Sequence, residues 1–181
     1  MRPVLIDADA FICLHGLKLL VPVIASLSRT RTVVLTEIVA RQELSALAKL
    51  VTDFETKGLI TIESLGKKSP AATLFRELRK TNDKGEAESV AWALHATELP
   101  LFVTRDVGAT KLAESRRVPA TDVMGVVVEA CEAGGLSRSD AEAALAVWDD
   151  KGQQRCRPSP YPGFDSAYAE RMEWRRNWEG S

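Results

Sequence analysis

Val4-Leu5-Ile6-Asp7-Ala8-Asp9 is a short apolar run that ends in acidic residues. A leucine-rich or β-branched run of this length, bounded by polar residues, is typical of a buried parallel strand. A second run, Leu101-Phe102-Val103, leads in the same way to Asp106. Because ligands of open α/β sheets gather outside the carboxyl ends of the strands, we expect Asp7 and Asp106 to point into one crevice.

Strand-like runs alternate with stretches of helical period along most of the chain. This alternation predicts an α/β fold with a mostly parallel central sheet and helices on both faces. We expect a main domain over residues 1–136. Residues 137–181 are expected to form a C-terminal extension of a short helix, a linker rich in Pro and Arg, and an aromatic, Arg-rich tail helix. The expected strands are residues 3–7, 32–35, 59–62 and 101–104.

Local signals predict several helix ends. Pro22 is expected to break a helix that spans residues 11–27, because proline removes a backbone donor. Thr36 is expected to cap the next helix, and Lys57-Gly58 to end it. Ser139-x-x-Glu142 is typical of a capping box, so it should open the short helix of the extension.

The composition limits the possible functions. A chain of 181 residues with 45% hydrophobic content can build one full core and an appendage. Its formal charge of −1 argues against holding nucleic acid through bulk charge, so such a contact requires a local basic patch and a metal. Three cysteines without C-x-x-C spacing indicate neither a disulfide framework nor a zinc site. Early acidic residues exclude a signal peptide, and we expect a cytoplasmic protein without membrane association.

Two more acidic residues follow the predicted strands. Glu43 lies on the segment after the second strand, where Glu37 is an alternative, and Glu86 starts an alanine-rich helix. Crowded carboxylates repel one another and raise each other's pKa, so such a set usually persists by sharing a divalent cation. Magnesium prefers hard oxygen ligands and keeps several waters, so two to four carboxylates suffice. The set predicts a Mg²⁺- or Mn²⁺-dependent enzyme that acts on phosphodiesters.

Three stretches, taken in order, resemble the PIN-domain nucleases. They are Val4 to Asp9, Gly85-Glu86-Ala87-Glu88-Ser89-Val90-Ala91-Trp92-Ala93, and Phe102 to Asp106, and the stretch from Val118 to Leu136 is also similar. The strongest likeness is to the branch with a Gly-Glu-x-Glu helix, many of whose members are toxins of type II toxin–antitoxin pairs. The resemblance covers roughly residues 1–136. It implies a compact three-layer α/β/α fold and a carboxylate cluster that binds one or two divalent ions.

The resemblance also implies residue roles and partners. Thr104 matches the small hydroxyl residue beside the last carboxylate. Asp9 stands where the family more often has Ser, Thr or Asn, and would reach the metal directly or through water. Arg105 stands where many relatives have Asp. The implied partners are an RNA substrate, an antitoxin protein and a second copy of the chain. The implied catalytic and metal-binding set is Asp7, Glu43, Glu86 and Asp106.

Two other functions stay open. Asp7-x-Asp9 after a strand also resembles the first motif of haloacid-dehalogenase-type phosphatases, in which the first Asp is a covalent nucleophile and the second an acid/base. Thr36 would then supply their hydroxyl motif. The third function is a non-catalytic PIN-like scaffold that uses its aromatic tail to bind a protein.

Two surface features complete the prediction. The tail places Phe164, Tyr168, Met172 and Trp178 on one helical face, with Trp174 and arginines beside it, so we expect it to dock on protein. The protein could be its own core, a second copy or a cognate inhibitor. The other feature is a run of basic residues that forms either a plain solvated face or a phosphate-tracking rim, namely Lys67, Lys68, Arg76, Arg79, Lys80 and Lys84.

Overall fold

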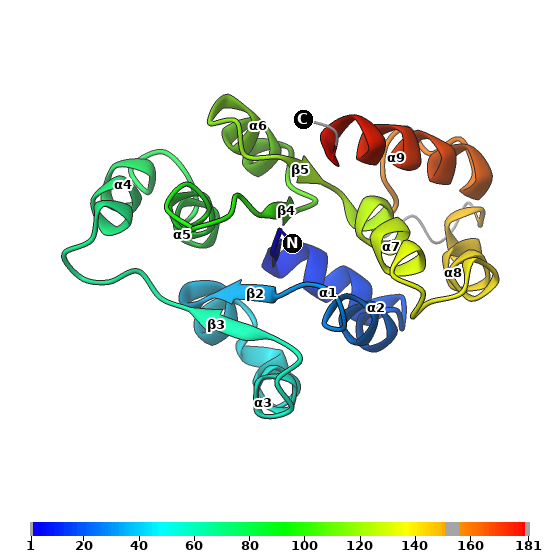
Figure 1. The fold of residues 1–181 in the computed structure, drawn as a ribbon, viewed down its shortest axis with the longest axis horizontal. Coiled ribbons are helices and arrows are strands. Elements are labelled where there is room, and N and C mark those ends of the chain that lie inside the picture. The colour runs from blue at the N-terminus through cyan, green and yellow to red at the C-terminus, as the bar shows by residue number, and fades with distance from the viewer. Residues whose placement is uncertain (1, 151–155, 180–181) are drawn as a thin grey trace.

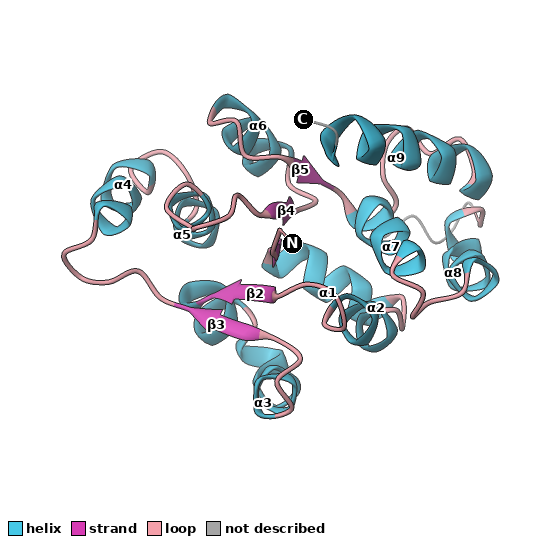
Figure 2. Ribbon diagram, in the orientation of Figure 1, coloured by secondary structure: helices cyan, strands magenta, loops and turns pink. Residues whose placement is uncertain are grey.

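The sheet of this protein has five parallel strands in the order β3-β2-β1-β4-β5. The structure is a computed structural model that describes residues 2–150 and 156–179, without the side chains of Trp178 and Glu179. All four predicted strands are confirmed, with ends that differ by at most two residues, while β5 was not predicted. Figure 2 shows the strands in magenta. They are β1 (Val4–Ile6), β2 (Val33–Thr36), β3 (Thr61–Glu63), β4 (Leu101–Val103) and β5 (Ala120–Thr121).

Helices cover both faces of the sheet, which confirms the predicted α/β class (Figure 1). Helices α4, α5 and α6 lie on one face, and α1, α2 and α7 on the other, with α8 and α9 outside α7. The helices are α1 (Ala8–Gly16), α2 (Leu20–Leu27), α3 (Ala48–Thr56), α4 (Pro70–Leu78), α5 (Lys84–Ala93), α6 (Val107–Ser115), α7 (Val123–Glu132), α8 (Arg138–Leu145) and α9 (Phe164–Glu179).

Alternate residues of each strand pack into two separate cores. Leu5, Val34 and Phe102 face α4, α5 and α6. Their chain neighbours Val4, Ile6, Val33, Leu35, Leu101 and Val103 face the other helices. Because successive side chains of a strand point to opposite faces, a strand buried on both sides must be apolar throughout. Each fully buried Leu or Val stabilises the fold by about 1.5–3 kcal/mol, so the central strands fix the sheet that carries the acidic residues.

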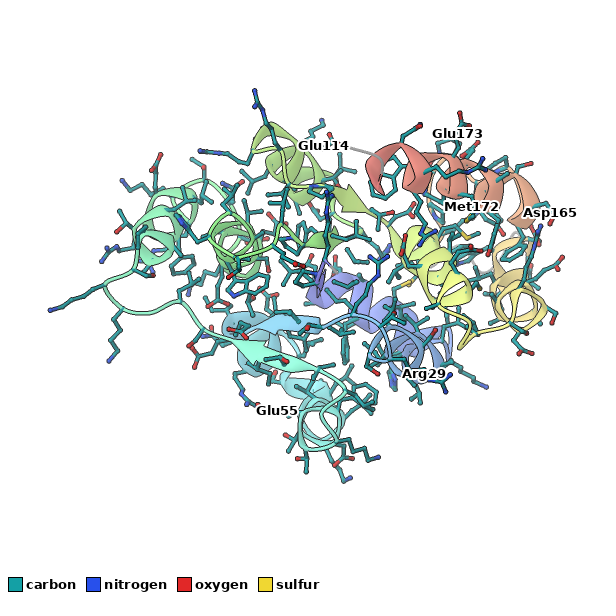
Figure 3. The ribbon with its side chains drawn as sticks, in the orientation of Figure 1. Arg29, Glu55, Glu114, Asp165, Met172 and Glu173 are labelled. Carbon is teal, nitrogen blue, oxygen red and sulfur yellow. The ribbon has the colours of Figure 1, made fainter. Side chains whose placement is uncertain are left out.

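The C-terminal extension packs on the rest of its own chain. Tyr168 and Phe164 of α9 are buried in the same core as α1, α2 and α7, so this core continues past residue 136. Met172 lies between α9 and α7 in Figure 3. Arg171 forms a bidentate pair with Asp122 just before α7, at 3.1 and 2.6 Å. Of the docking sites expected for the tail, its own domain is therefore the one observed. Trp178 and part of the expected linker, residues 153–155, lie outside the described residues.

Three of the predicted helix ends are wrong. The break after α1 lies at Lys18 (φ 59°), and Pro22 sits in the first turn of α2, where its missing N–H costs no helical hydrogen bond. Thr36 ends β2 and caps nothing. Ser137 rather than Ser139 caps α8, accepting a hydrogen bond from the N–H of Asp140. By contrast, the predicted stop at Gly58 is confirmed, since α3 ends at Thr56 and Gly58 adopts a φ of 67°.

The segment after β2 is not one regular helix. It begins as a π-helix over Val39–Glu43, continues as a 3₁₀ turn over Ser45–Leu47 and becomes regular only in α3. Short π-helical segments are frequent at functional sites, because the inserted residue re-aims the side chains around it. Here the irregular segment carries Glu43.

The described helices were also compared with the dimensions of a membrane. No single helix in residues 2–150 and 156–179 has the length and hydropathy needed for a span. Helices α1 and α2 reach that threshold only as a pair, and they are bent by 120° relative to each other.

Candidate functional site

Asp7 lies at the carboxyl end of β1 and is almost completely buried. Its Oδ1 accepts a hydrogen bond from the backbone N–H of Ala8 at 2.9 Å and so caps α1. Its Oδ2 accepts one from the hydroxyl of Thr104 at 2.9 Å. Burial nevertheless raises the pKa of Asp7, and the negative charges of Asp9 and Asp106 add to this rise. The two hydrogen bonds therefore hold the carboxylate in place without fully compensating its charge.

Asp106 follows β4, the strand next to β1, and caps α6. Its Oδ1 accepts a hydrogen bond from the N–H of Ala109 at 2.8 Å. Its own N–H donates to the Thr104 hydroxyl at 3.2 Å. That hydroxyl, which is fully buried, thus joins Asp7 to the backbone of Asp106. Thr104 takes the supporting position expected from the sequence, and the two strand-end aspartates are close enough for the charge of Asp106 to raise the pKa of Asp7.

Glu43 reaches the site from the π-helix, and Gly85 makes room for it. Its carboxylate accepts a hydrogen bond from the N–H of Gly85, although much of its stem is exposed. A Cβ added to Gly85 would lie 2.6 Å from Glu43 Cδ and closer still to both carboxylate oxygens. Burial of the carboxylate raises the pKa of Glu43, with a further rise caused by Asp7. The absence of a side chain at Gly85 is therefore what lets Glu43 approach α5.

Glu86 lies in the first turn of α5 and is the most strongly perturbed of the four. Its pKa is raised from the ordinary 4.5 to about 7. Desolvation is the largest cause, and the charges of Asp106, Asp7 and Asp83 add to it. A hydrogen bond with Asp106 also stabilises its protonated form. A carboxylate in the first turn of a helix is normally stabilised by the helix dipole. The pKa of Glu86 rises despite the helix dipole, so burial and negative neighbours have the larger effect on this carboxylate.

Three further acidic residues lie near the cluster or on the segments that form it: Asp9, Glu37 and Asp83. Asp9 is exposed in the first turn of α1, and its charge raises the pKa of both Asp7 and Glu43. Glu37 is exposed and perturbs only Glu88 among the shifted groups, so Glu43 is the acidic residue of this segment that joins the cluster. Asp83, which the sequence analysis missed, raises the pKa of Glu43 and Glu86. The sequence feature that could have revealed Asp83 is an acidic residue at the N-cap position, three residues before Glu86.

Glu88, which the sequence leaves as either a solvated residue or a support of the site, has a positioning role. It is buried, and its Oε2 accepts a hydrogen bond from the N–H of Ile38 at 2.6 Å. Its carboxylate also bonds the hydroxyl of Thr36, which in turn contacts the hydroxyl of Ser89 at 3.3 Å. Through these contacts Glu88 ties α5 to the start of the segment that carries Glu43. The sequence feature that indicates this role is an acidic residue on the alanine face of α5.

Four carboxylates from four segments thus converge without compensating cations. None of Asp7, Glu43, Glu86 and Asp106 has a Lys, Arg or His nitrogen within 4 Å in the part of the chain that the structure describes. Other acidic residues differ: Asp122 pairs with Arg171 at 2.6 Å, for example.

A hard divalent ion at these carboxylates would have to be held partly through water. Among the described residues, no three His, Cys, Asp or Glu side chains are already arranged as direct metal ligands. Magnesium does not need such a cage, because it usually keeps several waters and binds one or two carboxylates directly. The residues that could hold it are Asp7, Glu43, Glu86 and Asp106, with Asp9 at the rim.

No family model matches the chain, and the search of curated proteins finds no significant relative.

Replacing Gly85 by alanine should weaken metal binding at the site without lowering the stability of the fold. The new Cβ would displace the Glu43 carboxylate, so we expect Mn²⁺ affinity to fall about tenfold, roughly 1.4 kcal/mol. Alanine favours a helix over glycine by up to about 1 kcal/mol, so the melting temperature should stay equal or rise. Calorimetric titration with Mn²⁺ and a thermal melt would measure the two effects. Gly16→Ala in α1 is the matched control, since a Cβ there meets nothing within 4 Å. Unchanged metal affinity in Gly85→Ala would remove Glu43 from the site.

Proposed function

We propose that this protein is a divalent-metal-dependent ribonuclease that hydrolyses RNA phosphodiesters with Mg²⁺ or Mn²⁺. The observation that carries the proposal is the convergence of Asp7, Glu43, Glu86 and Asp106 at one edge of the sheet. Burial and neighbouring acidic charges raise the pKa of Asp7, Glu43 and Glu86, and none of the four has a cationic partner within 4 Å among the described residues. A folded protein that keeps such repulsion usually gains from it by binding a cation.

The proposal includes the PIN-like form of the fold. The resemblance of the sequence to PIN-domain nucleases implies a three-layer α/β/α architecture, and a parallel sheet with helices on both faces is consistent with it. A role as the toxin of a toxin–antitoxin pair, with an antitoxin partner and self-association, extends the proposal. Growth arrest on expression, relieved by the product of a small neighbouring gene, would test that extension.

RNA as the substrate is supported by a basic strap beside the cluster. We define the strap as residues 66–84, which contain six exposed basic side chains against the acidic Glu77 and Asp83. In the described structure none of the six has a carboxylate within 4 Å, although the whole chain has a net charge of −1. Helix α4 of the strap packs on α5, whose first turn carries Glu86. Unpaired cations beside a carboxylate site suit a polyanion whose phosphate must reach that site.

The chemistry follows from the residues. A bound divalent ion would polarise the phosphoryl oxygen and lower the pKa of a coordinated water. Asp7 is held by Ala8 and Thr104, and Asp106 by Ala109, so both present fixed oxygens. Such preorganisation lowers the cost of arranging charges during the reaction. Glu86, with its pKa near 7, can accept a proton at neutral pH.

The direct test is hydrolysis of a single-stranded RNA oligonucleotide. We expect cleavage with Mn²⁺ or Mg²⁺ and none with EDTA, measured as fragments on a denaturing gel. The phosphatase alternative predicts a phosphorylated Asp7, beryllium fluoride trapping and turnover of p-nitrophenyl phosphate. Thr36 counts against it, because this residue is fully buried and its hydroxyl is bonded to Glu88 and Ser89. Trapping at Asp7 without RNA cleavage would replace the nuclease proposal.

The stability of the metal-free protein should fall as the pH rises through 7. The folded-state pKa of Glu86, about 7, exceeds its ordinary value of 4.5, so the folded state binds more protons between these values. Stability is then highest at the acidic end of the window and is lost toward pH 8. Thermal melts in EDTA from pH 5.5 to 8 would measure this loss.

Two changes should reverse or reduce this dependence. Mn²⁺ at pH 8 should raise the melting temperature, because it binds the deprotonated carboxylates of the folded state. Glu86→Gln should flatten the dependence between pH 6 and 8. An equally steep dependence in that variant would show that the cluster does not cause it.

A further inference from the structure

A cleft adjoins the carboxylate cluster on the side of the C-terminal extension. This cleft has a volume of about 520 Å³ and lies between the β4–α6 turn, the start of α7 and the extension. Thr104 lines it and also donates the hydrogen bond to Asp7, so the cleft and the cluster share a residue. Clefts that hold small organic ligands range from about 300 to about 1,000 Å³. The space suits one nucleotide.

The wall formed by the extension lies beyond the segment that resembles a nuclease. Arg157, the chain from Pro158 to Pro160, and Trp174 of α9 line this side. Arg105 and Val107 line the side formed by the β4–α6 turn, and Val107 is 65% exposed. An exposed apolar side chain at the rim and an indole in the wall can pack on a base or a sugar.

The charges of the cleft favour an anion. The acidic residues Asp122 and Glu170 line it, but both lie near Arg171, at 2.6 and 3.9 Å. Arg105 and Arg157 are left without a carboxylate within 4 Å among the residues that the structure describes. Two arginines therefore remain for a ligand, and guanidinium groups bind phosphate in a bidentate manner.

Arg157 carries an unused donor. Its guanidinium lies 5.4 Å from the ring centroid of Tyr161, and one terminal nitrogen donates to the Tyr161 carbonyl at 3.4 Å. Its Nε is buried and has no hydrogen-bond acceptor in the described structure. A buried donor without an acceptor costs about 1–3 kcal/mol, so a turn of the guanidinium that gives this N–H an acceptor in the cleft would offset the cost.

We propose that this cleft binds the nucleotide of single-stranded RNA that flanks the scissile phosphate, with Arg105 and Arg157 on the phosphate of that flanking nucleotide and Trp174 beside its base. This inference rests on the proposed ribonuclease function and assigns the C-terminal extension a part in substrate binding. Arg105 and Arg157 are binding residues in this scheme, outside the carboxylate chemistry.

The test compares binding with chemistry on two substrates. Binding of a fluorescein-labelled single-stranded hexaribonucleotide is measured in EDTA, and hydrolysis is measured with Mn²⁺ on the same RNA and on bis(p-nitrophenyl) phosphate. The variants are Arg105→Gln, Arg157→Gln and the double change. Arg116→Gln, at the exposed end of α6 and outside the cleft, is the matched control.

We expect the double variant to raise the Kd and the KM for RNA by about tenfold or more. Its kcat for bis(p-nitrophenyl) phosphate should stay within about twofold of the wild type, since this substrate has no flanking nucleotide. An unchanged Kd, or an equal loss on both substrates, would overturn the cleft proposal. If wild type hydrolyses neither substrate while the double variant still weakens RNA binding, the ribonuclease proposal fails and the cleft proposal stands.

Tryptophan fluorescence gives a second readout that does not depend on the arginine variants. RNA should quench part of the emission of the four tryptophans, and Trp174→Phe should remove at least about half of that quenching, because stacking on the indole is its expected cause. Undiminished quenching in Trp174→Phe would remove Trp174 from the subsite. A melting temperature close to that of wild type would show that the variant is folded.

Discussion

Asp7→Asn should reduce RNA hydrolysis by about 1,000-fold or more and leave the fold at least as stable. Asp7 is the most buried of the four carboxylates, and hydrogen bonds from Ala8 and Thr104 fix its two oxygens. An amide loses the negative charge that a divalent ion requires, and several kcal/mol of lost charge stabilisation correspond to a loss of this size. Initial rates on single-stranded RNA with saturating Mn²⁺ would measure the effect.

The stability of this variant tests the electrostatic part of the argument. Burial raises the pKa of Asp7, so its charged form destabilises the metal-free fold at pH 8. Asparagine is as good an N-cap as aspartate, so the helical cap on α1 survives. We therefore expect an equal or higher melting temperature in EDTA. Asp53→Asn, which affects only an exposed pair with Lys49, is the control and should keep full activity. More than a tenth of the wild-type rate in Asp7→Asn would refute the assigned site.

Glu129→Leu should give the largest loss of stability, about 3–5 kcal/mol. Glu129 of α7 is 3% exposed and lies 2.7 Å from Arg31, whose side chain is 8% exposed, and 2.9 Å from Arg175 of α9. Both contacts are ion pairs by distance, and their angles are not those of aligned hydrogen bonds. Removal of the shared anion leaves two largely desolvated arginines close together. For a chain of this size the loss corresponds to a fall in melting temperature of roughly 6–20 °C.

Two controls separate charge from packing. The triple variant Arg31→Met, Glu129→Leu, Arg175→Met removes all three charges and should recover most of the stability, because apolar replacements of buried ion pairs are often neutral or stabilising. Glu55→Gln, in the exposed pair with Arg41, should cost less than about 1 kcal/mol. If Glu129→Leu lowers the melting temperature no more than Glu55→Gln does, solvent screens the triad and α9 is held by its other contacts, which include Arg171–Asp122.

The same triad explains why the position of the extension could not be predicted. Its members come from the turn before β2, from α7 and from α9, and no local pattern connects them. The helical period of the tail predicted an apolar face and a protein surface beneath it. The choice of α7 depended on contacts between residues 46 and 98 positions apart in the chain.

The candidate site shows the same division between local and distant information. The apolar runs before Asp7 and Asp106 determined two buried strands whose acidic ends share one edge, because burial on both faces requires uninterrupted apolar residues. Gly58 likewise determined a helix end, since its conformation is a property of one residue.

Only the tertiary structure decided how the other two carboxylates reach that edge. The segment after β2 departs from the regular helix expected there, and Glu43 lies against Gly85 because Glu88 fixes the start of the segment at Ile38. Two-residue β5, which the sequence analysis missed, is held mainly by pairing with β4. A sequence pattern records backbone hydrogen bonding and the burial of one face. The approach of segments about forty or more residues apart depends on close packing and on which buried polar groups satisfy one another, and these are settled only when the chain is folded.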